Sequence, residues 1–170
     1  MPLPSFIRHA RTLSVAATAF LLIASSAYSQ KPNPFSKFGG SWAGGGLIYL
    51  SNGNKEKIRC RGGFTPSEML NISSLKLELR CAGDSYTFEL LSDLNYDNGA
   101  VSGTWSENSR GVNGRVSGTI NGDQIKAVAE SQTFTATLEV ISLGDKQQVR
   151  ITSPGSEMTD VLIGLNRSSK

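Results

Sequence analysis

The chain has 170 residues, with 17 lysines and arginines, 14 aspartates and glutamates, one histidine and two cysteines. The single histidine, His9, lies in a segment that we expect to be removed, which leaves no histidine for a Ser-His-Asp or Cys-His arrangement, and two cysteines are too few for a structural zinc site. No phosphate-binding GxxxxGKS/T loop is present and no spacing singles out a pair among the 14 acids, so we expect no catalytic residues, no cofactor, no metal site and no enzymatic activity.

Residues 1–29 have the pattern of a cleaved secretory signal peptide. Arg8 and Arg11 precede an apolar run of twelve residues, and small residues follow this run. The run is shorter than the roughly 20 residues that a membrane-spanning helix needs, and the small residues fit cleavage after Ala27 or after Ser29. We therefore predict a periplasmic protein that is exported by the general secretory route and does not span the membrane after cleavage. An uncleaved membrane anchor is the alternative.

The 141 residues that remain after cleavage at Ser29 carry 15 basic and 14 acidic side chains. This near-neutral balance argues against a nucleic-acid partner. The length is enough for one domain with a hydrophobic core. We divide the chain into a lead-in segment at 30–43, a β-barrel domain at 44–167 and a tail at 168–170. Within the lead-in, residues 31–38 are expected to form a short lid or turn before the first strand.

Turn signals separate many short segments in which apolar and polar residues alternate. Asn-Gly, which suits the tight turns of β-hairpins, occurs four times, at 52–53, 98–99, 113–114 and 121–122. Alternation with a period of two is typical of strands that bury one face. We predict a longer loop at 62–74 and ten strands, at 44–50, 56–61, 75–82, 85–91, 100–106, 112–120, 123–129, 133–141, 146–152 and 160–166. Short strands at such regular spacing indicate an all-β fold, a single antiparallel meander β-barrel of about 8–10 short strands.

The alternation gives each predicted strand an apolar and a polar face. At 56–61, Ile58 and Cys60 share the apolar face, and at 75–82 the apolar face includes Cys81. Pairing of these two strands would bring the cysteines together, so we predict a Cys60–Cys81 disulfide in the oxidising periplasm. Opposite Cys60 lies a candidate partner surface, for which a solvated outer face is the simpler interpretation. We call this surface the basic face, and it consists of Lys55, Lys57, Arg59 and Arg61.

A nearly repeated octapeptide occurs at 98–105, NGAVSGTW, and at 113–120, NGRVSGTI. The spacing is too short for a self-standing repeat, so the two copies are interpreted as neighbouring strands. In each copy a glycine, Gly103 or Gly118, lies among the apolar positions that face inward. An inward glycine either bends the barrel wall or leaves a hollow. If the interior is hollow, the candidate lining of a ligand pocket is Trp42, Tyr86, Phe88, Gly103, Trp105, Gly118 and Phe134.

The segment GSW at 40–42 resembles the Gly-x-Trp element that opens lipocalin-like barrels. In those barrels an arginine near the last strand packs across the tryptophan, and Arg167 is similarly placed. The resemblance implies a lipocalin-like barrel. Over most of the mature chain, the sequence resembles a family of small secreted alphaproteobacterial proteins of unassigned function, especially those of rhizobial relatives. The similarity lies in the segments GSWAGGG, IRCRGGF, LRCAG, GAVSGTWSE and GRVSG. This second resemblance implies secretion and a shared disulfide, and it implies no particular activity.

Two functions are compatible with these patterns. We expect a non-catalytic periplasmic β-barrel that binds a small apolar or amphipathic ligand. The alternative is a cell-envelope interaction protein, or one that resembles the bacterial protease-inhibitor barrels, acting through its loops and the basic face. An integral membrane barrel is disfavoured, because the predicted strands are shorter than the roughly 9–11 residues needed to cross a bilayer. The chain also ends in Ser-Ser-Lys rather than in an aromatic residue.

Overall fold

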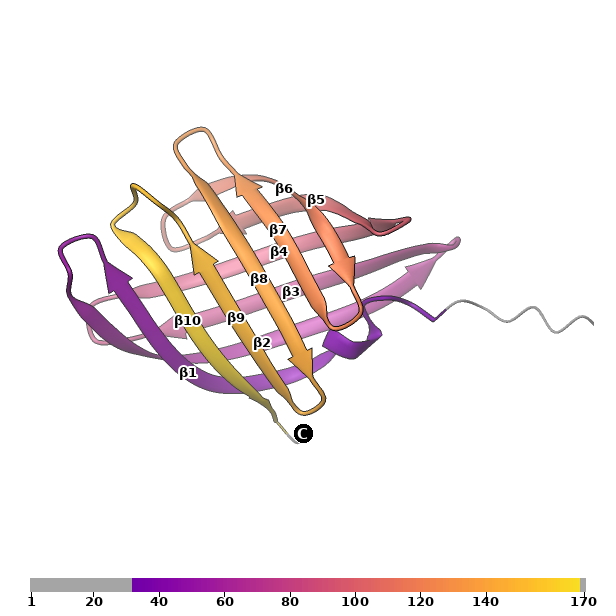
Figure 1. Ribbon diagram of the computed structural model, residues 1–170, viewed down its shortest axis with the longest axis horizontal. Helices are drawn as coiled ribbons and strands as arrows, with labels where there is room; N and C mark the ends of the chain where they lie inside the picture. The colour runs from indigo at the N-terminus through magenta and orange to yellow at the C-terminus, as the bar shows by residue number, and fades with distance from the viewer. Residues whose placement is uncertain (1–31, 169–170) are drawn as a thin grey trace, which may run out of the picture. The chain divides into compact units, whose positions relative to one another are not determined.

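The computed structural model describes residues 32–168, so the predicted signal peptide at 1–29 lies outside the described residues (Figure 1). The described chain forms a closed barrel of ten antiparallel strands, in which each strand pairs with the next and β10 pairs with β1. This confirms the predicted all-β meander barrel. The strands are β1 (Gly40–Leu50), β2 (Lys55–Met69), β3 (Ile72–Ala82), β4 (Thr87–Asp97), β5 (Ala100–Glu107), β6 (Val112–Asn121), β7 (Gln124–Glu130), β8 (Thr135–Leu143), β9 (Lys146–Thr152) and β10 (Met158–Arg167).

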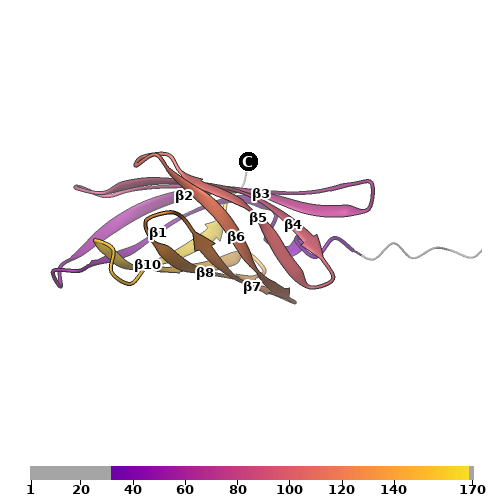
Figure 2. The ribbon, with the colours of Figure 1, turned by 90° about the horizontal axis from the view of Figure 1, so that it is seen from above.

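The strands form two facing walls. Figures 1 and 2 show β2–β5 in one wall and β7–β10 in the other, with the strands of the two walls running in different directions and β6 bending from the first wall to the second. Strand β1 closes the ring between β2 and β10. Alternate residues of each strand point inward, where the buried apolar side chains form one continuous core. This is the burial that the period-two pattern predicts.

Cys60 and Cys81 lie directly opposite each other in the register of β2 and β3, and a disulfide joins them. Both side chains are buried. The predicted pairing is therefore confirmed. The physical reason is that both cysteines occupy inward positions, so antiparallel pairing of their strands places the two sulfur atoms on the same face.

The loop predicted at 62–74 is wrong, because β2 and β3 continue through it as a paired hairpin with Met69 opposite Ile72. The two turn residues, Leu70 and Asn71, have positive φ angles of 51° and 66°. Such angles belong to the tight turns that match strand twist. Leucine seldom adopts positive φ and no glycine is present, so the sequence carried no turn signal here.

Strand β2 is 15 residues long. The argument from the sequence that the strands are too short to cross a membrane therefore does not hold.

One of the four Asn-Gly pairs does not form a turn. Asn98 and Gly99 have φ angles of 47° and 95° and join β4 to β5, as expected. Asn113 and Gly114 instead lie inside β6, where Gly114 is directly opposite Trp105. A Cβ atom on Gly114 would come within 1.7 Å of the Glu130 carbonyl oxygen. Close packing, rather than a turn, therefore requires glycine at this position.

Gly103 and Gly118 occupy inward positions of β5 and β6, at places where a neighbouring strand comes very close. A Cβ atom on Gly103 would lie 1.9 Å from the Asp93 carbonyl oxygen, and one on Gly118 would lie 2.1 Å from that of Lys126. Any side chain would push the neighbouring backbone away. Both contacts support the interpretation that these glycines bend the wall.

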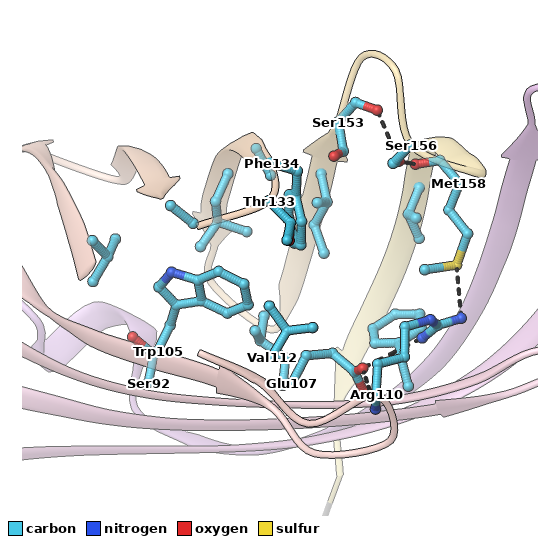
Figure 3. A pocket seen from close by; sticks show the side chains of 18 of the residues that line it. Ser92, Trp105, Glu107, Arg110, Val112, Thr133, Phe134, Ser153, Ser156 and Met158 are labelled. Carbon is cyan, nitrogen blue, oxygen red and sulfur yellow. Dashed lines mark hydrogen bonds and ion pairs between the residues drawn. The ribbon is translucent and has the colours of Figure 1, made fainter. Parts of the chain in front are cut away.

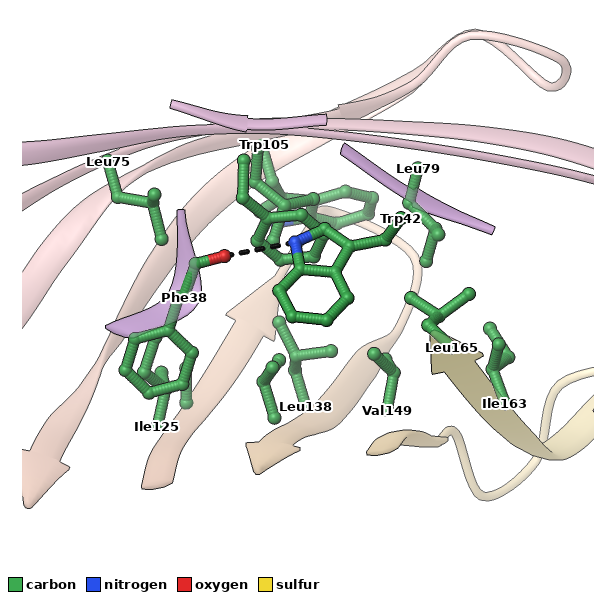
Figure 4. Packing of buried hydrophobic residues seen from close by; sticks show 14 of the residues in the cluster. Phe38, Trp42, Leu75, Leu79, Trp105, Ile125, Leu138, Val149, Ile163 and Leu165 are labelled. Carbon is green, nitrogen blue, oxygen red and sulfur yellow. Dashed lines mark hydrogen bonds between the residues drawn. The ribbon is translucent and has the colours of Figure 1, made fainter. Parts of the chain in front are cut away.

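The lead-in segment covers one end of the barrel, which we call the closed end. Residues 36–38 form a short 3₁₀ helix, η1 (Ser36–Phe38), and β1 begins at Gly40, inside the predicted lead-in. The side chains of Phe35 and Phe38 are fully buried, and Trp42 is 1% exposed. Figure 4 shows Phe38 and Trp42 side by side among the inward side chains of both walls. The expected lid at 31–38 therefore acts as an apolar plug.

Hydrogen bonds hold the plug in the barrel. The carbonyl oxygen of Phe38 accepts hydrogen bonds from Trp42 Nε1 at 3.1 Å and from Gln147 Nε2 at 2.9 Å. Arg167 lies over the indole, with its Cζ atom 4.3 Å from the ring centre of Trp42, and donates to the Gly39 carbonyl oxygen at 2.7 Å. The arginine–tryptophan contact implied by the lipocalin resemblance is thus present.

Candidate ligand-binding cavity

The other end of the barrel contains a cavity of about 380 Å³. Because η1 precedes β1, the loops that follow odd-numbered strands lie at this end, which we call the open end. Strands β4–β10 form the cavity walls, and the β5–β6, β7–β8 and β9–β10 loops surround its mouth (Figure 3). The volume falls within the range of about 300–1,000 Å³ typical of small-molecule sites. The apolar lining consists of Phe88, Leu90, Trp105, Val112, Val116, Ala129, Phe134, Ala136, Leu138, Ile151, Met158 and Val161.

The cavity exists because the inward side chains of β7 and β8 become smaller toward the open end. Along β7 they run from Ile125 through Ala127 to Ala129. At the closed end Ile125 lies opposite Val140 on β8, whereas at the open end Ala129 lies opposite Ala136. Side chains in a filled core pack without voids larger than a water molecule. Two facing alanines leave a space that the opposite wall does not fill.

Trp105 provides an aromatic wall for the cavity. Its ring centre lies 5.7 Å from that of Phe134, which lies in the β7–β8 loop at the mouth. The indole crosses Gly114, and its Nε1 atom donates to the Glu130 carbonyl oxygen at 3.3 Å. The hydrogen bond and the glycine together fix the position of the ring, so Trp105 is a preformed contact surface for an apolar molecule.

Glu107 organises the β5–β6 loop at the mouth. Its Oε1 atom accepts hydrogen bonds from the backbone N–H groups of Glu89 and Ser109, and its Oε2 atom accepts one from the backbone of Arg110. Burial favours the neutral form of Glu107, but these hydrogen bonds and the charge of Arg110 outweigh it, so the pKa of Glu107 is lowered. The carboxylate is therefore ionised at neutral pH and already saturated with donors.

Arg110 extends from that loop across the mouth. Its guanidinium makes only long contacts, 3.4 Å to Glu107 Oε2, 3.3 Å to the Thr87 carbonyl oxygen and 3.8 Å to the sulfur of Met158. Ordinary N–H···O hydrogen bonds are about 2.9–3.0 Å long. The Arg110 side chain remains 38% exposed, so this guanidinium keeps donor capacity at the entrance to an apolar cavity.

Two further acids at the rim are already bonded to protein donors. Tyr86 donates its hydroxyl to Glu157 Oε1 at 2.6 Å, and this hydrogen bond raises the pKa of Tyr86. Glu56 accepts the backbone N–H groups of Ser85 at 2.8 Å and Tyr86 at 3.1 Å. The first of these bonds contributes most to the lowered pKa of Glu56. Both carboxylates thus fix the β3–β4 loop beside the mouth.

Serine side chains supply the remaining polar groups of the lining. Ser92 Oγ donates to the Thr104 carbonyl oxygen at 2.9 Å, and Ser156 Oγ contacts the carbonyl oxygens of Ser153 and Met158 at 2.9 and 2.6 Å. Ser153 differs from them, since it is 6% exposed and its hydroxyl has no partner among the described residues. Buried hydroxyls nearly always have a partner, but the Ser153 Oγ atom has almost no accessible surface, so it is not open to the cavity.

The sequence-predicted lining falls into three groups. Phe88, Trp105 and Phe134 come together in the cavity wall. Trp42 belongs to the plug at the closed end, and Tyr86 lies at the rim with Glu157. The two glycines are wall residues rather than lining residues. Sequence reasoning missed Glu107, Arg110 and Ser153, because polar residues in short loops have the composition of ordinary turns.

The basic face lies on the outer surface of β2, and all four of its side chains are exposed. Lys55 lies near Tyr49, with its Nζ atom 5.6 Å from the ring centre. In the part of the chain that the structure describes, no acidic side chain lies within salt-bridge distance of Lys57, Arg59 or Arg61. This face is separate from the cavity, to which β2 contributes no lining residue.

Residues 32–168 contain no cluster of three or more histidine, cysteine, aspartate or glutamate side chains that could hold a metal ion. The same residues include no helix long and apolar enough to span a membrane.

No protein-family model and no curated protein matches the chain. Two solved structures share its fold. The S-type phycobiliprotein lyase CPES from Guillardia theta has a TM-score of 0.55 and 14% sequence identity, covering 80% of this chain and 91% of the lyase. Rv2717c from M. tuberculosis has a TM-score of 0.56 and 17% identity, covering 79% of this chain and 95% of Rv2717c. At these identities the likeness shows the fold alone, a lipocalin-like barrel.

The comparison corrects one expectation from the sequence. The chain was expected not to be an enzyme, because the mature part has no histidine and no recognisable catalytic pair. The same barrel is, however, the fold of a protein named as a lyase. The expectation is therefore wrong, because a fold shared with a lyase gives no ground for excluding enzymatic activity.

Proposed function

We propose that this chain is a periplasmic protein that binds a small apolar or amphipathic molecule in the cavity at the open end of its barrel. The observation that carries the proposal is the cavity of about 380 Å³ lined by Phe88, Trp105 and Phe134 in a barrel whose other end is plugged. The predicted signal peptide and the Cys60–Cys81 disulfide support the periplasmic location. Membership of the secreted alphaproteobacterial family stays a prediction.

A cavity-filling variant tests the proposal. Ala129→Phe places a benzyl group in the cavity, whereas Val128→Phe adds the same group to the outer face of the same strand, where Val128 is 36% exposed. The readout is titration with the neutral fluorescent probe N-phenylnaphthylamine, whose emission rises in apolar surroundings.

We expect the probe to bind to the unmodified chain and to Val128→Phe, and to lose at least tenfold in affinity for Ala129→Phe. Equal binding by all three proteins, or binding by none, would overturn the proposal. Circular dichroism shows that the variants are folded.

A second candidate function uses the basic face to bind an acidic protein of the cell envelope. The observation in its favour is that Arg61 lies directly opposite Arg80 on β3, a like-charge pair that costs stability unless a partner neutralises it. Arg80 itself pairs with Glu89 at 2.7 Å, which leaves Arg61 without an acid. Replacing Lys57, Arg59 and Arg61 together by glutamine should abolish low-salt capture of an acidic protein from periplasmic extract. Capture by the triple variant would refute this candidate.

A further inference from the structure

We propose that the ligand of the cavity is an amphipathic carboxylic acid, with its apolar chain against Trp105 and Phe134 and its carboxylate at the mouth, held by Arg110. This inference rests on the proposed function and adds the chemistry of the head group. It rests on which polar groups of the cavity lining can still form hydrogen bonds with a ligand.

The acids of the mouth have little left to offer a ligand. Both oxygens of Glu107 accept backbone N–H groups, and Glu157 accepts the Tyr86 hydroxyl. Neither carboxylate is therefore free to bind a cationic head group. An ammonium group could approach Glu157 only in competition with the Tyr86 hydroxyl.

The guanidinium of Arg110, by contrast, can still donate hydrogen bonds to a ligand. A guanidinium has five N–H donors in a planar fork that matches a carboxylate, and Arg110 satisfies them only with contacts of 3.3 Å or longer. These long contacts leave the guanidinium donor capacity at the mouth of an apolar cavity, which fits an acceptor on the ligand, and the charge of Arg110 favours an anionic one.

Arg110 and Ser153 belong to two loops that meet over the cavity. The Arg110 guanidinium contacts the sulfur of Met158, and Ser156 Oγ links the carbonyl oxygens of Met158 and Ser153. Figure 3 shows Ser153 and Ser156 on one side of the cavity and Glu107 and Arg110 on the other, with Trp105 extending into the space between them. A head group held by Arg110 at the mouth can therefore lay its chain against Trp105.

Displacement of bound N-phenylnaphthylamine tests the head-group chemistry. Dodecanoate, dodecanol and dodecylammonium share one apolar chain and differ only in their head groups. We expect dodecanoate to displace the probe at least tenfold more effectively than either of the other two at pH 7, since hydrogen bonds between charged groups are stronger than those between neutral ones. Equal displacement by all three, or a preference for dodecylammonium, would overturn the inference.

Two variants identify the residues. Arg110→Met keeps an apolar stem and removes the guanidinium, and its matched control, Arg115→Met, makes the same charge change at an exposed outer position of β6. We expect Arg110→Met to lose the preference for dodecanoate over dodecanol, and Arg115→Met to keep it.

The outcomes separate the inference from the function on which it rests. If the probe does not bind the unmodified protein, the proposed cavity function fails. If the probe binds and the Arg110→Met variant keeps the full preference for dodecanoate, the cavity function stands and the head-group assignment is wrong.

Discussion

The two ends of this barrel are built from the same ten strands and are packed in opposite ways. At the closed end Phe35, Phe38 and Trp42 fill the space between the walls, and their exposed fraction is at most 1%. At the open end Ala129 and Ala136 face each other and a cavity of about 380 Å³ remains. The barrel topology is therefore compatible with either outcome, and the sizes of a few inward side chains decide between them.

The polar groups of the two ends divide less sharply. At the closed end the Phe38 and Lys37 carbonyl oxygens are hydrogen-bonded to the side chains of Trp42, Gln147 and Ser142, but Gln147 Oε1 has no partner among the described residues. At the open end Ser153 Oγ likewise has no partner among the described residues, and Arg110 makes only long contacts. The two ends therefore differ in packing more than in hydrogen bonding.

Truncation of the two tryptophans would test this division most strongly. We expect Trp42→Ala to lower the free energy of unfolding by about 3–5 kcal/mol, as large core truncations do. Trp105→Ala should cost clearly less, because its ring already borders empty space. Urea unfolding followed by circular dichroism measures both. Equal losses for the two variants would show that the ends do not differ in packing.

Removal of the disulfide should affect stability without affecting the cavity. The double variant Cys60→Ala/Cys81→Ala opens a link between residues 21 positions apart, and we expect a loss of about 3 kcal/mol. Neither β2 nor β3 contributes to the cavity lining, so probe affinity should stay within twofold of the original. A large loss of affinity in a folded double variant would mean that the two regions are coupled.

The arginine at the closed end should contribute less than the tryptophan it covers. We expect Arg167→Met to lower the free energy of unfolding by about 1–2 kcal/mol, through the lost cation–π contact with Trp42 and the lost hydrogen bond to Gly39. The exposed Arg115→Met serves as the control and should change stability by less than about 0.5 kcal/mol. If both variants behave alike, the Arg167 contact is not stabilising.

The smallest expected effect concerns the pH dependence of the open end. The pKa of Glu107 is lowered from its ordinary value of 4.5, so its ionised form stabilises the folded state above that pH, and this contribution is lost as the pH falls through the lower, folded-state pKa. Glu107→Gln should therefore be less stable than the original at pH 7, with a gap that narrows in acid. A gap independent of pH would show that the carboxylate charge is not the cause.

The sequence predicted the fold well where local patterns govern it. Period-two alternation placed ten strands, and the inward phase of Cys60 and Cys81 predicted their disulfide. It failed at Leu70 and Asn71, where a turn forms without glycine, and at Asn113-Gly114, where glycine serves packing rather than a turn. In both cases tertiary pairing outweighed the local preference of the residues.

The candidate site could be predicted only in part. Phe88, Trp105 and Phe134 were identified because they are aromatic and in phase with the interior, but the same criterion selected Trp42, which belongs to the plug. Arg110 and Ser153 were missed, because the direction of a loop side chain depends on how the barrel closes around it.

By itself the sequence determined an all-β chain with one disulfide and an outer basic face, and these features follow from alternation and from pairing of neighbouring strands, both of which are local. The arginine over Trp42 was implied by the lipocalin resemblance alone. Only the tertiary structure decided that one end is sealed and the other hollow. The reason is that a void depends on the summed volume of side chains from strands far apart in the chain, here β4 to β10, and no periodicity along one strand records that sum.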